Sequence, residues 1–272
     1  MQRSEYLKPY WLGPVGAGAK SGAVVVHGFT GVPWDVLPVG EGLAADGFTV
    51  DLPLLAGHDG GVDGIKNVSL EDWRACVDES AARVYDATKQ ALLMVGFSMG
   101  GLLALDFALR TDLPIAAVVS LAAPLKLGWL AREASKLAAT KDWAEPLTWP
   151  KFGGSDIEKK VSMPGADGIP LRAVSELDRL IEEVRMGLPD LKVPLLVVQS
   201  RHDHTSPSDS PWELTHLAGS RFKRLVILKR GFHVITRDVC WPEVVSEVRA
   251  FASKHVKPPK KKRARKARAA KK

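Results

Sequence analysis

The sequence predicts an α/β fold in which a mostly parallel central sheet carries helices on both faces. Two observations lead to this prediction. Short, continuously apolar runs recur along the chain, which is typical of strands buried on both faces. Segments with a helical spacing of apolar residues lie between these runs, as crossover helices do between parallel strands. The 272 residues, 46% of them hydrophobic, are enough to bury one large core.

Six apolar runs are expected to form the strands of the sheet. The first, AVVVHGF, reads as a buried parallel strand that ends at a glycine. The second is interrupted by Pro53 and is followed by the glycine-rich loop AGHDGGVDG. The six runs are residues 23–29, 48–55, 91–95, 115–121, 193–203 and 224–233.

Helices are expected between these strands. One begins at Ser69, because Asp72 follows three positions later and completes a capping box, and apolar residues then recur at helical spacing. In two others a proline stands at the first helical turn, where its missing N–H is tolerated. The remaining expected helices are 100–110, one that opens at Ser210-Pro211 and one that follows Trp241-Pro242.

The alternation of strands and helices stops between about residues 125 and 191. Strand-like runs are missing there, and Trp129, Trp143 and Trp149 stand among short helical stretches and breaks at proline and glycine. We therefore expect one α/β domain over residues 1–256, interrupted by a small helical cap over about 125–191.

The charge is divided unevenly along the chain. The formal net charge is +7, but residues 257–272 hold ten Lys or Arg and no acidic residue, which leaves −3 for residues 1–256. A block of like charges without apolar residues predicts a disordered tail. Such a tail is suited to weak, sequence-independent contact with nucleic acid or anionic lipid.

Other features of the composition predict a cytoplasmic protein. No stretch approaches the roughly 18 apolar residues of a membrane helix, and the N-terminus lacks the apolar region of a signal peptide. The two cysteines, Cys76 and Cys240, have no CxxC spacing, so we expect reduced thiols rather than a disulfide framework.

The motif GFSMG, residues 96–100, predicts a catalytic nucleophile at Ser98. G-x-S-x-G alone recurs by chance, but here an apolar strand runs directly into it and a helix runs directly out. That context is the nucleophile elbow, a strained turn that needs small residues on either side of the serine. The helix N-terminus behind Ser98 also favours negative charge on the reacting carbonyl oxygen.

A base and an acid are expected to follow the serine in the order Ser, acid, His. His233 is the last histidine before the final helix and directly follows a strand. Asp203 stands at the end of another strand, between Ser98 and His233 in the chain, and would fix the tautomer of the imidazole. Asp209 is the alternative acid, although it lies six residues farther along.

Two backbone amides are expected to stabilise the oxyanion that forms during acyl transfer. One is the N–H of Met99, directly after the nucleophile. The other is the N–H of Phe29, in the loop HGFTG that follows the first strand. His202 and His204 could in principle bind a metal, but no further ligands accompany them, so we expect neither a metal nor a cofactor.

Four of these stretches together resemble the α/β-hydrolase superfamily. More narrowly, they resemble the bacterial carboxylesterases and monoacylglycerol lipases that have a small helical cap. The resemblance covers about residues 10–255 and not the basic tail. The four stretches are HGFTG (27–31), GFSMGG (96–101), VVQSRHD (197–203) and FHVITRD (232–238).

The resemblance implies a role for five residues. Ser98 is the nucleophile, Asp203 the acid and His233 the base, and the amides of Phe29 and Met99 form the oxyanion hole. The chain departs from the family at one point, since relatives commonly have a glycine directly before the histidine and this chain has phenylalanine there.

The predicted function is hydrolysis of carboxylic esters with short to medium acyl chains, through an acyl-enzyme. Monoacylglycerol lipase is the alternative, and thioesterase and peptidase remain open. A haloalkane dehalogenase is disfavoured because its elbow residue is aspartate. A nucleic-acid-associated protein that acts through its basic tail is disfavoured because Ser, Asp and His stand in order at three strand ends.

Overall fold

The computed structural model describes residues 5–140, 147–150 and 165–257. The predicted basic tail therefore lies outside the described residues except for Lys257, and Trp143 of the predicted cap lies outside them as well.

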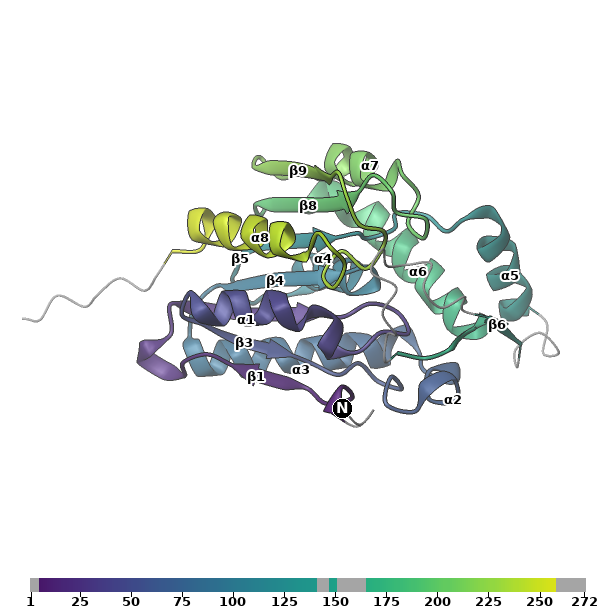
Figure 1. The fold of residues 1–272 in the computed structure, drawn as a ribbon, viewed down its shortest axis with the longest axis horizontal. Coiled ribbons are helices and arrows are strands. Elements are labelled where there is room, and N and C mark those ends of the chain that lie inside the picture. The colour runs from purple at the N-terminus through teal and green to yellow at the C-terminus, as the bar shows by residue number, and fades with distance from the viewer. Residues whose placement is uncertain (1–4, 141–146, 151–164, 258–272) are drawn as a thin grey trace, which may run out of the picture.

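A mixed, mostly parallel sheet forms the centre of the molecule (Figure 1). In the described residues this sheet has seven strands in the order β1-β3-β2-β4-β5-β8-β9. All neighbouring pairs run parallel except β1 and β3. The strands are β1 (Tyr10–Leu12), β2 (Ser21–Val26), β3 (Phe48–Leu52), β4 (Leu92–Phe97), β5 (Ile115–Leu121), β8 (Leu195–Ser200) and β9 (Lys223–Leu228).

The six strands predicted from apolar runs are all present, and the edge strand β1 is additional. Its three residues give no periodic pattern, and its middle side chain, Trp11, is 41% exposed. It pairs antiparallel with β3, so that Tyr10 lies opposite Leu52. An antiparallel edge strand on a mostly parallel sheet is common in this fold class.

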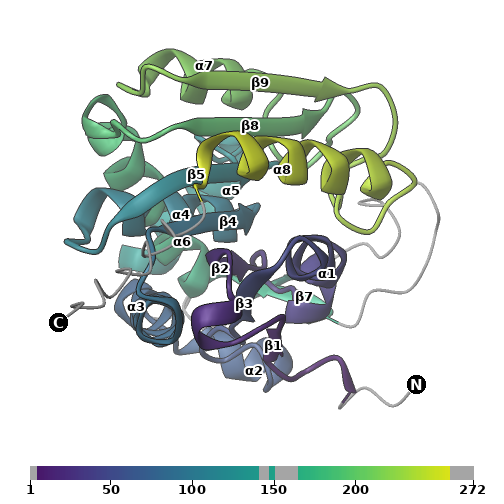
Figure 2. The same ribbon diagram turned by 90° about the vertical axis from the view of Figure 1, so that its left-hand side faces the viewer.

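Helices cover both faces of the sheet, as predicted (Figure 2). Alternate residues of β2 show the division: Val24 and Val26 face one core cluster, and Ala23 and Val25 face the other. The first cluster is covered by α3 (Leu70–Thr88), α4 (Met99–Arg110), α6 (Leu171–Gly187) and α7 (Ser210–Leu217). The second is covered by α1 (Leu37–Ala45) and α8 (Trp241–His255).

The predicted start of α3 is confirmed. Ser69 and Asp72 form the reciprocal capping box, in which each side chain accepts from the other residue's backbone N–H. Helix α1 was not predicted, because its sequence LPVGEGLAA contains two glycines. Gly42 is needed there because a Cβ would lie 2.6 Å from a methyl group of Val245 in α8.

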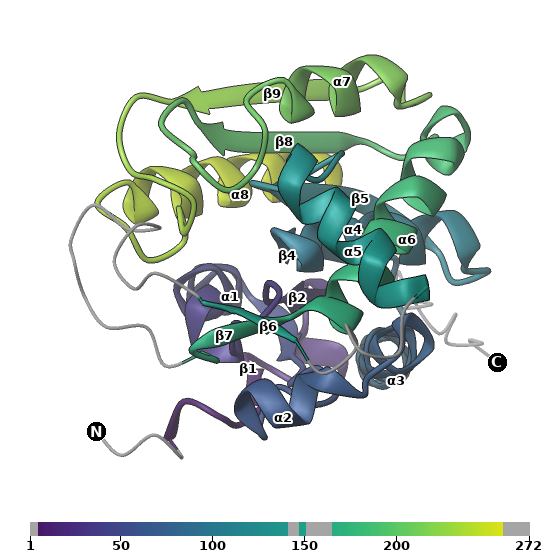
Figure 3. The same cartoon turned by 90° about the vertical axis from the view of Figure 1, so that its right-hand side faces the viewer.

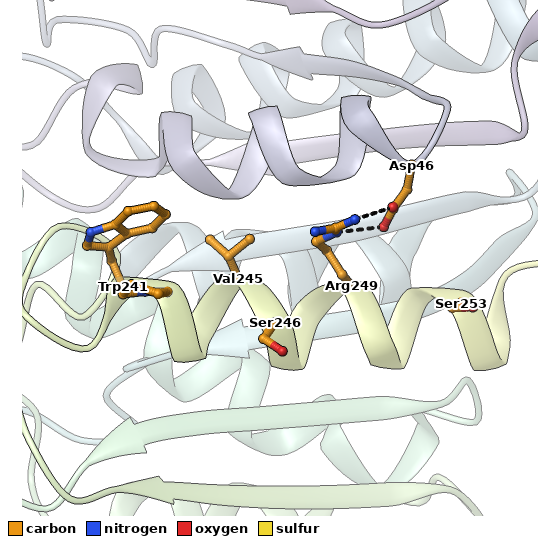
Figure 4. Close-up of a pocket in the computed structure, with 7 residues that line it drawn as sticks. Asp46, Trp241, Val245, Ser246, Arg249 and Ser253 are labelled. Carbon is orange, nitrogen blue, oxygen red and sulfur yellow. Dashed lines mark hydrogen bonds and ion pairs between the residues drawn. The ribbon is translucent and has the colours of Figure 1, made fainter.

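A shallow groove runs between α1 and α8 (Figure 4). Arg249 of α8 spans it to bind the carboxylate of Asp46, which follows α1, at 2.5 and 2.9 Å. None of the predicted site residues lines this groove, and we assign it no role. Its lining is Asp46, Trp241, Pro242, Val245, Ser246, Arg249 and Ser253.

The segment between β5 and β8 contains α5 (Trp129–Thr140), an antiparallel pair of β6 (Thr148–Pro150) with β7 (Gly168–Pro170), and α6. The described α5, β6 and β7 lie at the end of the sheet where the parallel strands finish, and α6 leads back along one face of the sheet beside α4 (Figure 3). The two short strands were not predicted, because each has three residues and ends in proline. Trp129 is 77% exposed, so the body of the protein does not cover it.

Helix α6 joins this segment to the body of the protein. Leu180, Ile181 and other apolar residues of α6 belong to the same core cluster as α3 and α4. On the polar side, Arg74 of α3 binds both Asp106 of α4, at 2.6 Å, and Glu183 of α6, at 2.5 Å. Three helices are therefore held together by one guanidinium group. None of the helices that the structure describes is long and apolar enough to span a bilayer.

Candidate active site

Ser98 lies on the sharp turn between β4 and α4, at φ 53° and ψ −120°. This is a strained conformation for a residue with a side chain. The turn requires glycine on both sides: a Cβ on Gly96 would lie 1.9 Å from the carbonyl oxygen of Gly100, and one on Gly100 would lie 2.2 Å from that of Val26. The Ser98 N–H donates to the carbonyl of Leu121 in β5 at 2.7 Å. The bend is the elbow that the motif predicts.

The structure brings Ser98, His233 and Asp203 into one chain of hydrogen bonds. The Ser98 Oγ lies 3.0 Å from His233 Nε2, and His233 Nδ1 lies 2.9 and 3.1 Å from the two carboxylate oxygens of Asp203. A carboxylate can only accept, so Nδ1 carries the proton and the Ser98 hydroxyl donates to Nε2. The side chains of His233 and Asp203 are 7% and 1% exposed, so water competes little for these bonds.

Backbone amides of its own loop hold the carboxylate of Asp203. The N–H groups of Thr205 and Ser206 donate to Oδ1 at 2.8 and 2.9 Å. The alternative acid, Asp209, does not reach His233, because its exposed carboxylate binds the ammonium group of Lys126 instead. That ion pair lowers the pKa of Asp209.

The two predicted oxyanion donors come from the elbow itself and from the loop after β2. Met99 is the first residue of α4, where an N–H has no partner within the helix. Phe29 follows Gly28, at which a Cβ would lie 3.1 Å from the Cβ of Ser98. Within the described part of the chain, neither amide donates to another protein group.

The orientation of the Phe29 amide follows from its peptide plane. The carbonyl of that plane, from Gly28, accepts from the Gly31 N–H at 3.1 Å and from His27 Nδ1 at 3.0 Å. In a trans peptide the N–H points opposite to the carbonyl. The Phe29 N–H is therefore directed away from His27 and Gly31.

Enzymes that transfer acyl groups use a serine next to a histidine, a carboxylate that binds the histidine, and two amides near the serine. The arrangement around Ser98 has all of these groups. Residues 18–239 match the model of the protein family described as serine aminopeptidase, S33. The chain belongs to this family. It is a hydrolase of the α/β-hydrolase class that uses a serine, as the resemblance noted in the sequence implied.

Curated relatives of this S33 hydrolase include two from Bacillus. The chain is 28% identical over 235 residues to the thermostable monoacylglycerol lipase of Bacillus sp. (strain H-257), covering 86% of this chain and 91% of that protein. It is 26% identical over 222 residues to the carboxylesterase of Bacillus subtilis (strain 168), covering 81% and 87%.

Solved structures resemble it as well. A structure reported for LipS and LipT, two metagenome-derived lipolytic enzymes, matches with a TM-score of 0.83 at 28% identity. The match covers 92% of this chain and 98% of that chain. The match to the family model and the match to this solved structure both confirm the predicted fold class.

The loop that carries His233 accommodates the departure from the family pattern. Phe232, which stands where relatives commonly have glycine, donates its N–H to the carboxylate of Asp238 at 2.7 Å. The neighbouring Gly231 has φ +83°, and a Cβ there would lie 2.5 Å from Cys240 Sγ. Asp238 stands within the stretch FHVITRD, and its role was not predicted. The buried carboxylate fixes the backbone next to His233.

Two buried histidines support the loops beneath the site. His27 Nε2 accepts from the Leu55 N–H at 3.1 Å, and His58 Nδ1 donates to the carbonyl of Ala56 at 3.0 Å. Their rings are 4.8 Å apart. Burial lowers the pKa of His58 to about 4, and burial together with the neighbouring His58 lowers the pKa of His27 well below its usual value.

The remaining histidines near the site are not arranged as metal ligands. The ring of His204 packs beside Phe232, with 5.1 Å between the ring centroids. His202 is exposed. Among the residues that the structure describes, no three His, Cys, Asp or Glu side chains are grouped as a metal ion would need.

Proposed function

We propose that this hydrolase cleaves carboxylic esters of short to medium acyl chains through an acyl-enzyme formed on Ser98. The observation that carries the proposal is the buried chain of hydrogen bonds from Ser98 through His233 to Asp203. In this reading Ser98 is the nucleophile, His233 the base and Asp203 the acid.

The reaction has two acyl-transfer steps. In the first, Ser98 Oγ attacks the ester carbonyl while His233 Nε2 takes the proton of Ser98. The tetrahedral intermediate then breaks its bond to the leaving alkoxy oxygen, which takes that proton from His233 and departs as the alcohol. In the second, His233 takes a proton from water, which attacks the acyl group on Ser98. The tetrahedral intermediate then releases the carboxylic acid, and the proton returns to Ser98 Oγ.

Each remaining part has a role in these steps. Asp203 keeps the proton on Nδ1 and stabilises the imidazolium that forms in each step. The N–H groups of Phe29 and Met99 donate to the oxyanion of both tetrahedral intermediates. The N-terminus of α4 adds a favourable field for that negative charge.

The segment of about residues 125–191 would act as a cap over the acyl-binding region. Its described elements α5, β6 and β7 lie at the end of the sheet where Ser98, Asp203 and His233 follow β4, β8 and β9 (Figure 3). The proposal includes that this cap limits the length of the acyl chain that the site accepts.

Monoacylglycerol hydrolysis is the second candidate. Its support is the Bacillus sp. relative, which is a monoacylglycerol lipase and shares 28% identity over nearly all of its length. A monoacylglycerol is itself a carboxylic ester, so the same residues would perform the same steps.

The test is a substrate profile of the full chain. Rates are measured on p-nitrophenyl esters from acetate to palmitate, on monoacylglycerols, on an acyl thioester and on a peptide p-nitroanilide. The carboxylesterase proposal predicts the highest kcat/KM among short and medium esters. A maximum on monoacylglycerols favours the second candidate, and turnover confined to the thioester or the anilide refutes both. A fluorophosphonate identifies the nucleophile by labelling Ser98 in the intact protein.

A further inference from the structure

The loop that carries the Phe29 amide contains a strained turn. The Gly31 N–H closes it onto the Gly28 carbonyl at 3.1 Å, with Phe29 and Thr30 as the central residues. Thr30 has φ +58°, a left-handed conformation that turns of this kind assign to glycine or asparagine. A β-branched residue is a real outlier there. Such strain persists only where the surroundings hold the residue in place.

One of the groups that holds Thr30 comes from the segment between β5 and β8. The Ala166 N–H donates to the Thr30 carbonyl oxygen at 2.9 Å. Thr30 is 3% exposed and Ala166 is 5% exposed, so this hydrogen bond is shielded from water.

The close approach depends on glycine at the preceding position. A Cβ at Gly165 would lie 2.0 Å from the Thr30 carbonyl oxygen and 3.3 Å from the Gly31 Cα. The first of these distances is far inside van der Waals contact, and the opposing atom is backbone, which cannot move away as a side chain would. Any residue other than glycine at 165 would therefore displace one of the two segments.

We propose that Gly165 and Ala166 are positioning residues for the oxyanion hole. Their contact holds Thr30 in the left-handed conformation, and the turn in that conformation directs the Phe29 N–H. The inference rests on the proposed function, in which that amide stabilises the oxyanion. The segment between β5 and β8 thus contributes to the chemical step as well as to the enclosure of the substrate.

The chain offers a matched pair of substitutions to test this. Gly165→Ala places a methyl group against Thr30. Gly128→Ala makes the same change directly before α5 in the same segment, where a Cβ would meet nothing within 4 Å. Three quantities are measured on the full chain: kcat and KM for p-nitrophenyl acetate, the inhibition constant of an alkyl boronic acid, and the midpoint of thermal unfolding. The boronic acid forms a tetrahedral adduct on the serine that needs the oxyanion donors.

For Gly165→Ala we expect kcat to fall by roughly 10- to 100-fold. This loss is no larger than the loss in kcat that follows removal of one whole oxyanion donor. KM should change by less than about threefold, and the boronic acid should bind more weakly by a factor similar to the loss in kcat. Gly128→Ala should match the wild type in all three quantities.

The contrary outcomes separate this inference from the proposed function. If the wild type is active and Gly165→Ala is equally active, the inference alone is overturned. The inference alone is also overturned if kcat of Gly165→Ala falls while its affinity for the boronic acid is unchanged. A wild type that hydrolyses no ester and binds no boronic acid overturns both. If Gly165→Ala does not fold, Ala166→Pro replaces it, because proline removes the donating N–H and puts a ring carbon in its place. The same loss of kcat and of boronic acid affinity is then expected.

Discussion

Both carboxylate oxygens of Asp203 lie within 3.1 Å of His233 Nδ1, although 30 positions separate the two residues in the chain. The carboxylate is almost fully buried and is held by two amides of its own loop. Asp209, only six positions beyond Asp203, is exposed and paired with Lys126. The two aspartates therefore make a discriminating pair of variants.

Asp203→Asn is expected to lower kcat by about 10⁴-fold, because an amide at this position lets the imidazole adopt the wrong tautomer. Asp209→Asn should change kcat by less than about threefold, since it removes an exposed ion pair that contributes little. Steady-state kinetics on one p-nitrophenyl ester measure both. The opposite ranking would transfer the acid role to Asp209.

Ser98→Ala should abolish the acyl-enzyme route and reduce ester hydrolysis by several orders of magnitude. The variant should stay folded, since alanine is smaller and the Ser98 backbone bonds remain. The check is kcat/KM together with the circular dichroism spectrum and the loss of fluorophosphonate labelling. Substantial hydrolysis by a folded, unlabelled variant would show that the nucleophile is elsewhere.

The buried histidines predict that stability decreases on acidification. His58 has a pKa of about 4 in the folded state, against an ordinary value of 6.5 in the unfolded chain. The unfolded state therefore binds more protons between these values. The free energy of unfolding should be fully retained above pH 6.5 and should fall as the pH approaches 4, by up to about 3 kcal/mol from this group.

Urea unfolding at a series of pH values measures that slope. His58→Gln should make the curve shallower between pH 6.5 and 4, and the shallower curve should still slope because the pKa of His27 is lowered too. His216→Gln, at an exposed position of α7, is the matched control. An equal slope in the wild type and in His58→Gln would show that His58 does not couple folding to protonation.

We also expect residues 258–272 to be dispensable for catalysis. They hold nine Lys or Arg and none of the residues of the hydrogen-bonded site. Deleting them should leave kcat and KM on small neutral esters within about twofold of the full chain. The deletion should remove salt-sensitive binding to DNA or to anionic vesicles, if the full chain shows it. A folded but inactive truncated protein would assign the tail to the enzyme.

The sequence predicted the central strands because burial on both faces leaves a continuous apolar run in each of them. The same rule could not find β1, β6 or β7, whose three residues are too few for any pattern. Helix α1 escaped for a different reason. Its glycines lower helix propensity, and they are present because Leu52 and Val245 pack against them, a contact that no local pattern records.

The three side chains of the candidate site could be predicted from their order in the chain. The residues that directly follow parallel strands lie at the same end of the sheet, so Ser98, Asp203 and His233 could be named together. Which of two aspartates meets the imidazole depends on the path of a short loop, and the sequence could only rank them. The contact between Gly165 and Thr30 joins distant segments without a motif, and the supporting role of Asp238 is likewise visible only in the folded chain.

Helix α8 carries the chain away from the hydrogen-bonded site. The helix starts a few residues after His233, at the end of the sheet that holds Ser98, and runs about 22 Å to the opposite end (Figure 1). There His255 lies beside Phe222, just before β9 begins. The described part of the chain therefore ends at the opposite end of the sheet from Ser98, so a probe attached at Lys257 would stand clear of the hydrogen-bonded site.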